Sequence, residues 1–325
     1  MQESFESFLL SVCKAKALSK IETIQSLWSG YGEIVRYKLH NGIYETVVVK
    51  HIVTGRSTRH PRGWDTSNSH NRKLKSYEVE SYWYQNWQIG ETSLYRTAKH
   101  IGSYHAQDES WIVLEDLKNS YPVQKSQVGL TAIKPGLKWL ANFHATHLNK
   151  APDGLWEIGT YWHLDTRPDE LQQMNDSDLK KRAGWIDTVL KKAKYQTIVH
   201  GDAKLANFCF SSDGTEVAAV DFQYVGGGCG MKDISYFLGS CLNSDELRIH
   251  EKALLNFYFS ALKEAFNQLN KKESAEQIEK EWRYLYPFAC ADFTRFMLGW
   301  MPQHQKINTY SLDKVKAVLQ LYPNG

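Results

Sequence analysis

The sequence predicts an α+β chain with two lobes, a small antiparallel sheet followed by a larger, mainly helical part. Two β-rich runs, 33–39 and 44–52, flank an Asn-Gly pair, and Asn-Gly between such runs is a strong hairpin signal. The second half of the chain carries long segments with hydrophobic residues at helical spacing. We therefore expect a first lobe over 1–117 and a second over 118–325.

Composition excludes several classes of protein. The 325 residues are 42% hydrophobic and 23% charged, which is typical of a soluble globular protein. The net charge of +3 is too small to indicate nucleic acid or an anionic membrane as a partner. Five scattered cysteines without a C-x-x-C pair favour reduced thiols in the cytoplasm. No signal peptide and no apolar run of about 18 residues is present. The oligomeric state stays open.

The first lobe is predicted to hold helices as well as strands. Residues 3–27 have hydrophobic side chains at helical spacing and are expected to form two helices. The polar, mostly basic segment 54–75 is predicted to be a long loop, and 76–87 a helix. Strands over 101–104 and 111–114 would complete the antiparallel sheet.

Three features of this lobe are suited to a nucleotide. Gly30 and Gly32 precede the first hairpin strand and would let backbone N–H groups approach phosphate oxygens, although two glycines are equally typical of a simple turn. Lys50 ends a hydrophobic strand, where its ammonium would reach phosphates. Glu80 is expected to pair with Lys50. Glu78 is the alternative, because the two lie about 200° apart on a helix and only one can face inward.

The second lobe is predicted to be helical over 137–148, 245–269, 275–300 and 312–321. His144, on the hydrophobic face of the first of these helices, is interpreted as a core histidine, because no metal-ligating partner lies at suitable spacing. Residues 151–195 are interpreted as an insertion near the acceptor side. The glycine-rich run 226–230 would either allow close approach of a substrate or form a flexible turn.

The residues best suited to catalysis lie in one continuous stretch, HGDAKLANFCFSSDGTEVAAVD, from His200 to Asp221. Phosphoryl transfer requires a carboxylate to hold the acceptor hydroxyl and oxygen ligands to hold Mg²⁺ on the phosphates. Asp202 lies five positions before Asn207, and a predicted hairpin separates both from Asp221, which is the spacing of a kinase catalytic loop and its metal-binding Asp. We predict Asp202 as the base and Asn207 and Asp221 as Mg²⁺ ligands. Two polar turns around a hairpin are the alternative.

The segment after Asp221 favours a small acceptor. Asp233 follows Asp221 by only twelve positions. A protein kinase needs a longer activation segment there to bind a peptide. We therefore expect a small-molecule hydroxyl as the acceptor.

Together these motifs resemble the aminoglycoside phosphotransferase and choline kinase superfamily, which has the protein-kinase-like fold. HGDAKLANF, VDFQ and the lobe junction LEDL are most similar to the ecdysteroid-kinase-like branch. The resemblance covers roughly 27–300 and implies a bilobal protein-kinase-like fold with ATP- and Mg²⁺-dependent transfer of the γ-phosphoryl group to a hydroxyl.

The resemblance also implies roles for individual residues. His200 would be a packing residue of the catalytic loop, Asp233 a structural Asp that braces it, and Lys204 a contact to the transferring phosphate. At the lobe junction, backbone groups of Glu115 and Leu117 are candidates for hydrogen bonds to adenine, although an ordinary loop has the same sequence character. A catalytically inactive nucleotide-binding pseudokinase is the alternative function, and the presence of the full set of site residues argues against it.

Overall fold

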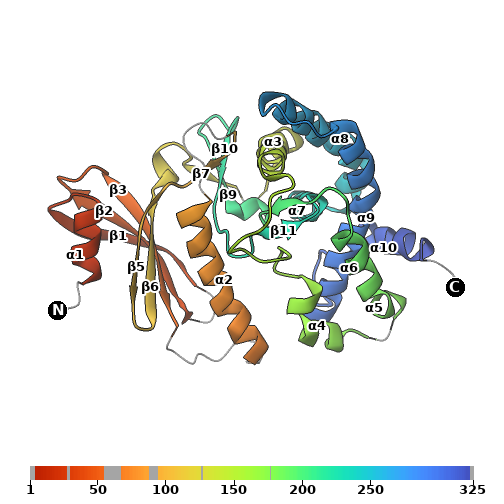
Figure 1. Cartoon of the computed structure of the whole chain (residues 1–325), viewed down its shortest axis with the longest axis horizontal. Coiled ribbons are helices and arrows are strands. Elements are labelled where there is room, and N and C mark those ends of the chain that lie inside the picture. Colours follow the sequence, from red (N-terminus) through yellow and green to blue (C-terminus); the bar gives the residue numbers. More distant parts are fainter. Residues whose placement is uncertain are drawn as a thin grey trace. The chain divides into compact units, whose positions relative to one another are not determined.

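The chain folds into two compact units, which Figure 1 shows with their elements labelled. The first consists of Met1–Glu91 and Thr97–Pro122, and the second of Thr92–Arg96 and Val123–Gly325. The computed structural model describes residues 4–27, 30–54, 67–87, 94–125, 127–175 and 177–322. An antiparallel sheet characterises the first unit and helices the second, so the predicted α+β fold class is confirmed.

The first unit is built on a five-stranded antiparallel sheet with the strand order β1-β2-β3-β6-β5. Helices α1 and α2 belong to the same unit. α1 packs on the face that carries Val47 and Val49. Because successive strand residues point to opposite faces, Lys50 lies on the other face, toward α2. The bounds of these elements are α1 Phe5–Val12, β1 Ala17–Ser26, β2 Gly32–His40, β3 Thr46–Val53, α2 Ser67–Asn86, β5 His100–Ala106 and β6 Glu109–Glu115.

The second of the two predicted N-terminal helices is instead strand β1. Its pairing with β2 is irregular between Lys20 and Glu22 and between Thr23 and Gln25. Each bulge inserts one extra residue, Ile21 or Ile24, into a strand whose ordinary side-chain period is two. The hydrophobic residues therefore recur every three positions, and this spacing was mistaken for a helical one.

The predicted loop 54–75 is also partly wrong, because α2 begins at Ser67. The first turns of α2 are polar and carry almost no hydrophobic residue, so helical periodicity was invisible there. Residues 55–66 of the predicted loop lie outside the described residues.

The second unit combines long helices with short strands. β7, β9 and β10 form an antiparallel sheet that also includes β4, and β8 pairs with β11. The predicted long helices are confirmed as α8, α9 and α10. The bounds are β4 Arg96–Thr97, β7 Val123–Gln124, α3 Leu130–His147, α4 Pro168–Gln173, α5 Asp178–Lys181, α6 Ala183–Lys191, β8 Thr197–Val199, β9 Phe208–Phe210, β10 Val217–Ala219, β11 Gly226–Gly228, α7 Met231–Cys241, α8 Ser244–Gln268, α9 Ala275–Trp300 and α10 Thr309–Gln320.

α3 begins seven residues before the predicted start at residue 137. The pair Pro135-Gly136 is typical of a helix boundary, yet it lies inside α3. A Cβ on Gly136 would come within 2.3 Å of the Phe237 ring, so glycine permits α3 to pack closely on α7.

Gly226–Gly228 do not form a flexible turn, which corrects that prediction. These glycines form β11, which is buried and pairs with β8. A Cβ on Gly226 would lie 2.2 Å from the Trp156 carbonyl oxygen, and one on Gly227 would lie 2.5 Å from that of Glu157. The glycines are needed because the backbone of the preceding segment packs directly on them.

Gly226→Ala is expected to lower the free energy of unfolding by roughly 3 kcal/mol, because the added methyl group meets a backbone oxygen that cannot rotate away. Gly239→Ala, inside α7, is the matched control. A Cβ there meets nothing within 4 Å, and replacing a helical glycine should stabilise the fold by about 0.5–1 kcal/mol. Urea unfolding of both variants measures the contrast. Equal stability of the two would contradict this account of β11.

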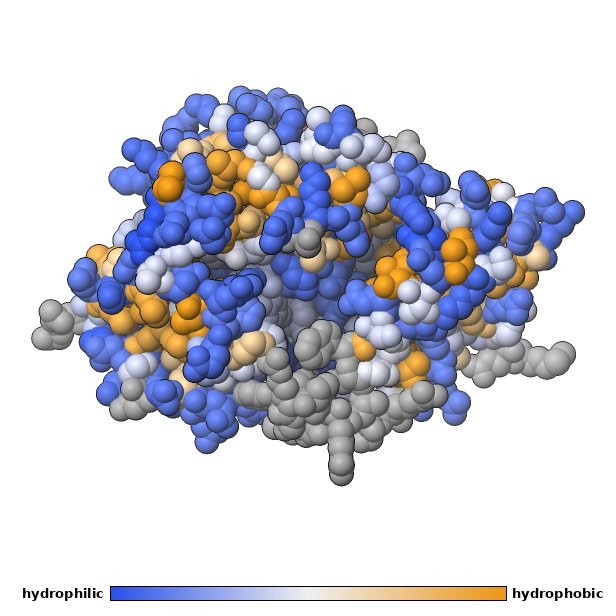
Figure 2. Space-filling model, turned by 180° about the vertical axis from the view of Figure 1, so that it is seen from behind, coloured by the Kyte–Doolittle hydropathy of each residue, from blue (hydrophilic) through white to orange (hydrophobic). Residues whose placement is uncertain are grey.

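The molecular surface shown in Figure 2 is largely hydrophilic, and its hydrophobic residues gather in separate patches. Among the described helices, none has the length and apolar character needed to cross a membrane. All five cysteines are free thiols, as the sequence predicts.

Candidate active site

β3 and α2 bring Lys50 and Glu80 together. Lys50 Nζ donates a hydrogen bond to Glu80 Oε2 at 2.6 Å, and both side chains are buried. The Glu78 side chain is 70% exposed and lies 3.6 Å from the Lys75 ammonium. Of the two candidate acids, the structure therefore pairs Glu80 with Lys50.

Gly30 precedes β2 and Gly32 begins it, with φ angles of 73° and 130°. Leu27 N–H donates to the Gly32 carbonyl at 2.8 Å. A Cβ on Gly32 would lie only 2.0 Å from the His51 carbonyl oxygen. Packing against β3 thus already requires glycine at position 32, and a phosphate contact there stays a prediction.

At the lobe junction, Glu115 and Leu117 differ in their backbone hydrogen bonding. Glu115 N–H donates to the Lys99 carbonyl at 2.9 Å, whereas none of the residues that the structure describes accepts from Leu117 N–H. Between them, Asp116 accepts from Arg36 Nε at 2.7 Å and is largely buried. This ion pair fixes the backbone next to Leu117, whose N–H remains available as a hydrogen-bond donor.

The catalytic-loop stretch begins where β8 ends. Gly201 has a φ of 79°, and a Cβ there would lie 2.0 Å from the Tyr224 carbonyl oxygen. Only glycine fits this turn, which directs the chain from β8 into Asp202. The Tyr161 N–H donates to the Gly201 carbonyl at 3.2 Å and ties a distant segment to the loop.

Asp202 is the centre of a compact polar group. Lys204 Nζ lies 2.8 Å from Asp202 Oδ2, and Asn207 Nδ2 donates to the same oxygen at 3.1 Å and to the Asp202 carbonyl at 2.8 Å. Although burial lowers the pKa of Lys204, the carboxylates of Asp202 and Asp221 together raise it. Lys204 is therefore held as a cation beside both acids.

The β9–β10 hairpin returns the chain to this group. Val220 N–H donates to the Asn207 carbonyl at 3.0 Å, which places Asp221 next to Asn207. Asp221 adopts a φ of 70°, an uncommon value for a residue other than glycine. Its Oδ1 accepts a hydrogen bond from Gln223 Nε2 at 2.7 Å. The structure thus brings Asp202, Lys204, Asn207 and Asp221 together.

Asp233 of α7 anchors the loop that leads to Asp202, because it accepts two of its backbone hydrogen bonds. Its Oδ2 accepts from His200 N–H at 2.6 Å and its Oδ1 accepts from Gly201 N–H at 3.0 Å. His144 Nε2 lies 3.1 Å from Asp233 Oδ2, and His144 Nδ1 lies 2.8 Å from the Tyr258 hydroxyl. Asp233 and His144 are fully buried. His144 is thus a hydrogen-bonded core residue, in line with its interpretation from sequence.

His200 joins the two ends of the site. Its Nε2 lies 3.0 Å from the Val220 carbonyl, and Asp202 N–H donates to its Nδ1 at 3.3 Å. These contacts require the tautomer with the proton on Nε2. The ring also packs against Phe222 at a centroid distance of 4.6 Å. His200 therefore links the loop that carries Asp202 to the strand end that carries Asp221.

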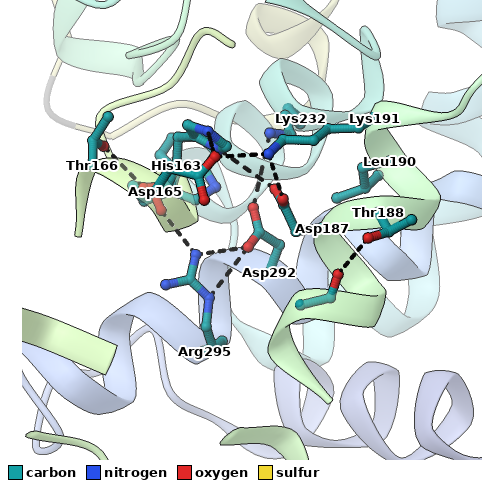
Figure 3. A network of polar contacts seen from close by, with 12 residues as sticks. His163, Asp165, Thr166, Asp187, Thr188, Leu190, Lys191, Lys232, Asp292 and Arg295 are labelled. Carbon is teal, nitrogen blue, oxygen red and sulfur yellow. Dashed lines mark hydrogen bonds and ion pairs between the residues drawn. The ribbon is translucent and has the colours of Figure 1, made fainter. Parts of the chain in front are cut away.

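A buried ionic network supports the same unit, and Figure 3 shows its side chains converging from α6, α7 and α9. Arg295 Nη2 contacts Asp292 Oδ1 at 2.7 Å and the Trp162 carbonyl at 2.9 Å. Lys232, beside Asp233, lies 4.0 Å from Asp292. Lys232, Asp292 and Arg295 are almost completely buried, so removal of one partner would leave another charge uncompensated. The network fixes the segment around Trp162 against α7 and α9.

On the α6 side of this network, Lys191 bridges two acids. Its Nζ lies 2.8 Å from both Asp165 Oδ2 and Asp187 Oδ2, and His163 Nδ1 lies 3.4 Å from Asp187 Oδ1. Although burial raises the pKa of Asp187, hydrogen bonds from His163 and Lys191 lower it to about 2. Asp187 therefore carries its negative charge at neutral pH despite being buried.

Three residues near Asp202 were missed by the sequence-based prediction. Burial and the charge of Asp202 raise the pKa values of Tyr161 and Tyr236, and the charge of Asp202 also acts on Lys306. Tyr161 lies in the segment 151–195 that the sequence-based interpretation places near the acceptor side, and the adjoining Trp162 is completely buried in the core. The aromatic residue that directly follows Tyr161 in the sequence was the available signal. No local pattern marks Lys306, which reaches the site only through the fold.

Groups of three or more His, Cys, Asp or Glu that could hold a metal ion do not occur among the described residues. The site instead offers Asp221 together with the amide oxygen of Asn207, whose amide nitrogen is directed at Asp202. Mg²⁺ typically takes only one or two protein ligands and completes its shell with water and phosphate oxygens, so this donor set fits it.

Comparison with known proteins agrees with the predicted resemblance. Residues 162–271 match the model of the ecdysteroid kinase-like family. A search of curated protein sequences found no match. The fold is similar to that of an ethanolamine kinase from Plasmodium vivax, at 12% identity and a TM-score of 0.51, covering 92% of this chain and 81% of that one.

A second similar structure is an amicoumacin kinase in complex with AMP-PNP and Ca²⁺, at 11% identity and a TM-score of 0.50, covering 98% of this chain and 92% of that one. At these identities the similarity concerns the fold. The predicted recognition is thereby confirmed: the chain has a protein-kinase-like fold and is similar to the ecdysteroid kinase-like family over residues 162–271, which include the predicted catalytic loop.

Proposed function

We propose that the protein is a phosphotransferase that uses ATP and Mg²⁺ to phosphorylate a hydroxyl group of a small molecule. The observation that carries the proposal is the group formed by Asp202, Lys204, Asn207 and Asp221 on a loop anchored to Asp233. The family match and the two kinase structures with a similar fold support it.

In this proposal Asp202 orients the acceptor hydroxyl and takes up its proton. The transition state of phosphoryl transfer is loose, so the proton moves late and orientation is the main contribution. Lys204 contacts the transferring phosphoryl group, whose negative charge its ammonium complements. His200 and Asp233 touch neither substrate nor nucleotide and act by holding the loop.

Asn207 and Asp221 would hold Mg²⁺. When bound, the metal would neutralise charge on the nucleotide phosphates and orient them. The amicoumacin kinase complex contains an ATP analogue and a divalent cation, which supports this pairing of cofactors.

For the nucleotide itself, we propose that Lys50 contacts the phosphates, with Glu80 fixing its ammonium. A buried ion pair adds little net stability, because desolvation offsets the attraction between the charges, so its presence favours a functional role. Gly30 and Gly32 are proposed to cover the phosphates, and Glu115 and Leu117 to contact adenine. The first unit would then bind nucleotide, and the second would carry out catalysis.

A small-molecule acceptor, rather than nucleic acid or a membrane, fits the short segment after Asp221. We further propose a cytoplasmic location, which suits five free thiols.

Asp221→Asn is expected to abolish most of the Mg²⁺-dependent rise in melting temperature that ATP gives the wild type. Asparagine is chosen because it tolerates the left-handed backbone at this position, whereas alanine would add about 1–2 kcal/mol of strain. The melting temperature of the ligand-free variant should stay close to that of the wild type. Asp245→Asn, an exposed change on α8, is the control. An undiminished ATP shift in Asp221→Asn would contradict the metal-binding role.

A further inference from the structure

An aromatic cluster lies beside Asp202 in the second unit. Trp162, Tyr236, Phe296 and Met297 form its buried centre, and Phe293 packs against it. The Tyr161 hydroxyl donates to that of Tyr236 at 3.2 Å, and the pKa values of both are raised by burial and by the charge of Asp202. An acceptor whose hydroxyl meets Asp202 would therefore have aromatic rings beside its body.

Lys306 places a positive charge on this cluster. It lies in the segment between α9 and α10, next to Ile307, which packs on the cluster. Its Nζ lies 4.3 Å from the centroid of the Tyr236 ring and 5.5 Å from that of Phe293. No carboxylate of the described residues lies within ion-pair distance of this ammonium.

The electrostatic surroundings of Lys306 are those of an unsatisfied cation. Burial lowers its pKa to about 8, Asp202 raises it, and Lys204 lowers it. Asp202 is already paired with Lys204 at 2.8 Å, so Lys306 is not required to neutralise it. At neutral pH the ammonium is charged and half-buried, and aromatic faces compensate it only in part. A negatively charged group on the ligand would complete its environment.

We propose that Lys306 is a specificity-determining residue of the acceptor site, and that its ammonium selects alcohols with a negatively charged group and disfavours those with an amine. This inference rests on the proposed function, because it assumes that the acceptor hydroxyl meets Asp202. An anionic group would pair with Lys306 in a setting partly shielded from water, where charge-assisted hydrogen bonds are strong. A cationic group at the same place would meet like charge.

Three probes of nearly equal shape test this: 4-(hydroxymethyl)benzoate, 4-(hydroxymethyl)benzamide and 4-(hydroxymethyl)benzylamine. Their equilibrium binding is measured by calorimetry without nucleotide, on wild type, Lys306→Met and Lys306→Glu. Lys280→Met, an exposed lysine on α9, is the matched control. Circular dichroism verifies the fold of each variant, and Lys306→Met keeps the test valid should the glutamate variant not fold.

The wild type and Lys280→Met should bind the benzoate roughly tenfold more tightly than the benzamide, the factor that corresponds to about 1.4 kcal/mol. The benzylamine should bind most weakly. Lys306→Met should remove the preference for the anion, and Lys306→Glu should reverse it. An unchanged ratio in Lys306→Met, a wild-type preference for the amine, or saturation by none of the probes at millimolar concentration would overturn the proposal.

A pH series separates a charge effect from a change in shape. The wild-type preference for benzoate over benzamide should fall once the pH exceeds about 8, as Lys306 loses its proton. Lys204 and Asp202 of the catalytic loop, and Tyr236 and Cys241 of α7, also face this ammonium. The pKa values of Lys204, Tyr236 and Cys241 are raised, so these groups keep their protons in this range.

Lys306→Met should show no such decline, and an equal decline in this variant would contradict the proposal. Because binding is measured without phosphoryl transfer, a protein that discriminates among the probes but transfers no phosphate would refute the proposed function alone. A protein that transfers phosphate but shows no dependence on Lys306 would refute the present inference alone.

Discussion

Asp202→Asn is expected to lower the rate of phosphoryl transfer by about 10²–10⁴, the usual contribution of a positioned acid or base. The substitution keeps the size of the side chain but replaces one carboxylate oxygen by an NH₂ group and removes the negative charge that faces Lys204 and Asn207. The amide can still orient a hydroxyl in part, yet it cannot take up its proton. Single-turnover transfer from labelled ATP measures the loss directly.

Two controls make that loss interpretable. Asp245→Asn removes an exposed carboxylate from α8 and should leave the rate unchanged. The Mg²⁺-dependent stabilisation of Asp202→Asn by ATP should persist, because Asp202 is assigned to the acceptor and not to the metal. Transfer by Asp202→Asn at the wild-type rate would rule out this role. Loss of the ATP-dependent stabilisation would move Asp202 into the nucleotide site.

Asp233→Ala should lower the free energy of unfolding by about 3–5 kcal/mol, because each buried hydrogen-bonding group left without a partner costs about 1–3 kcal/mol. Three donors would lose their acceptor at once: His200 N–H, Gly201 N–H and His144 Nε2. All three lie in a fully buried setting where water cannot replace the carboxylate. Urea denaturation followed by tryptophan fluorescence gives the change.

Asp313→Ala is the matched control for Asp233→Ala. Asp313 also pairs with a cation, Arg248, but its side chain is 48% exposed, so its loss should change stability by less than about 1 kcal/mol. If the two substitutions destabilise the protein to the same small extent, the loop is held by other contacts and Asp233 is not its anchor.

The proposed catalytic group was accessible from sequence because its members are close along the chain. A loop and a hairpin fix the relation of Asp202, Asn207 and Asp221 almost locally, so their spacing predicts that they meet. Helix geometry also predicted the pairing of Glu80 with Lys50, since only one of two helix faces can contact Lys50. In both cases the positions of the residues along one loop, hairpin or helix were sufficient for the prediction.

Other features depend on contacts that no local pattern encodes. The two bulges of β1 give a strand the spacing of a helix, and the glycines of β11 are explained by a backbone segment 70 residues earlier in the chain. Lys306 joins the site from more than 100 positions beyond Asp202, after two intervening long helices. Residues of this kind are identified only when the tertiary fold is known.

The most direct test of the central claim is transfer of the γ-phosphoryl group from labelled ATP, with Mg²⁺, into a pooled extract of small metabolites. The wild type and Asp202→Asn are compared in parallel. The account predicts a labelled small-molecule product that the wild type forms and Asp202→Asn forms at most slowly. Formation of the product at equal rates by both proteins, or a wild type that neither forms a product nor is stabilised by ATP with Mg²⁺, would contradict it.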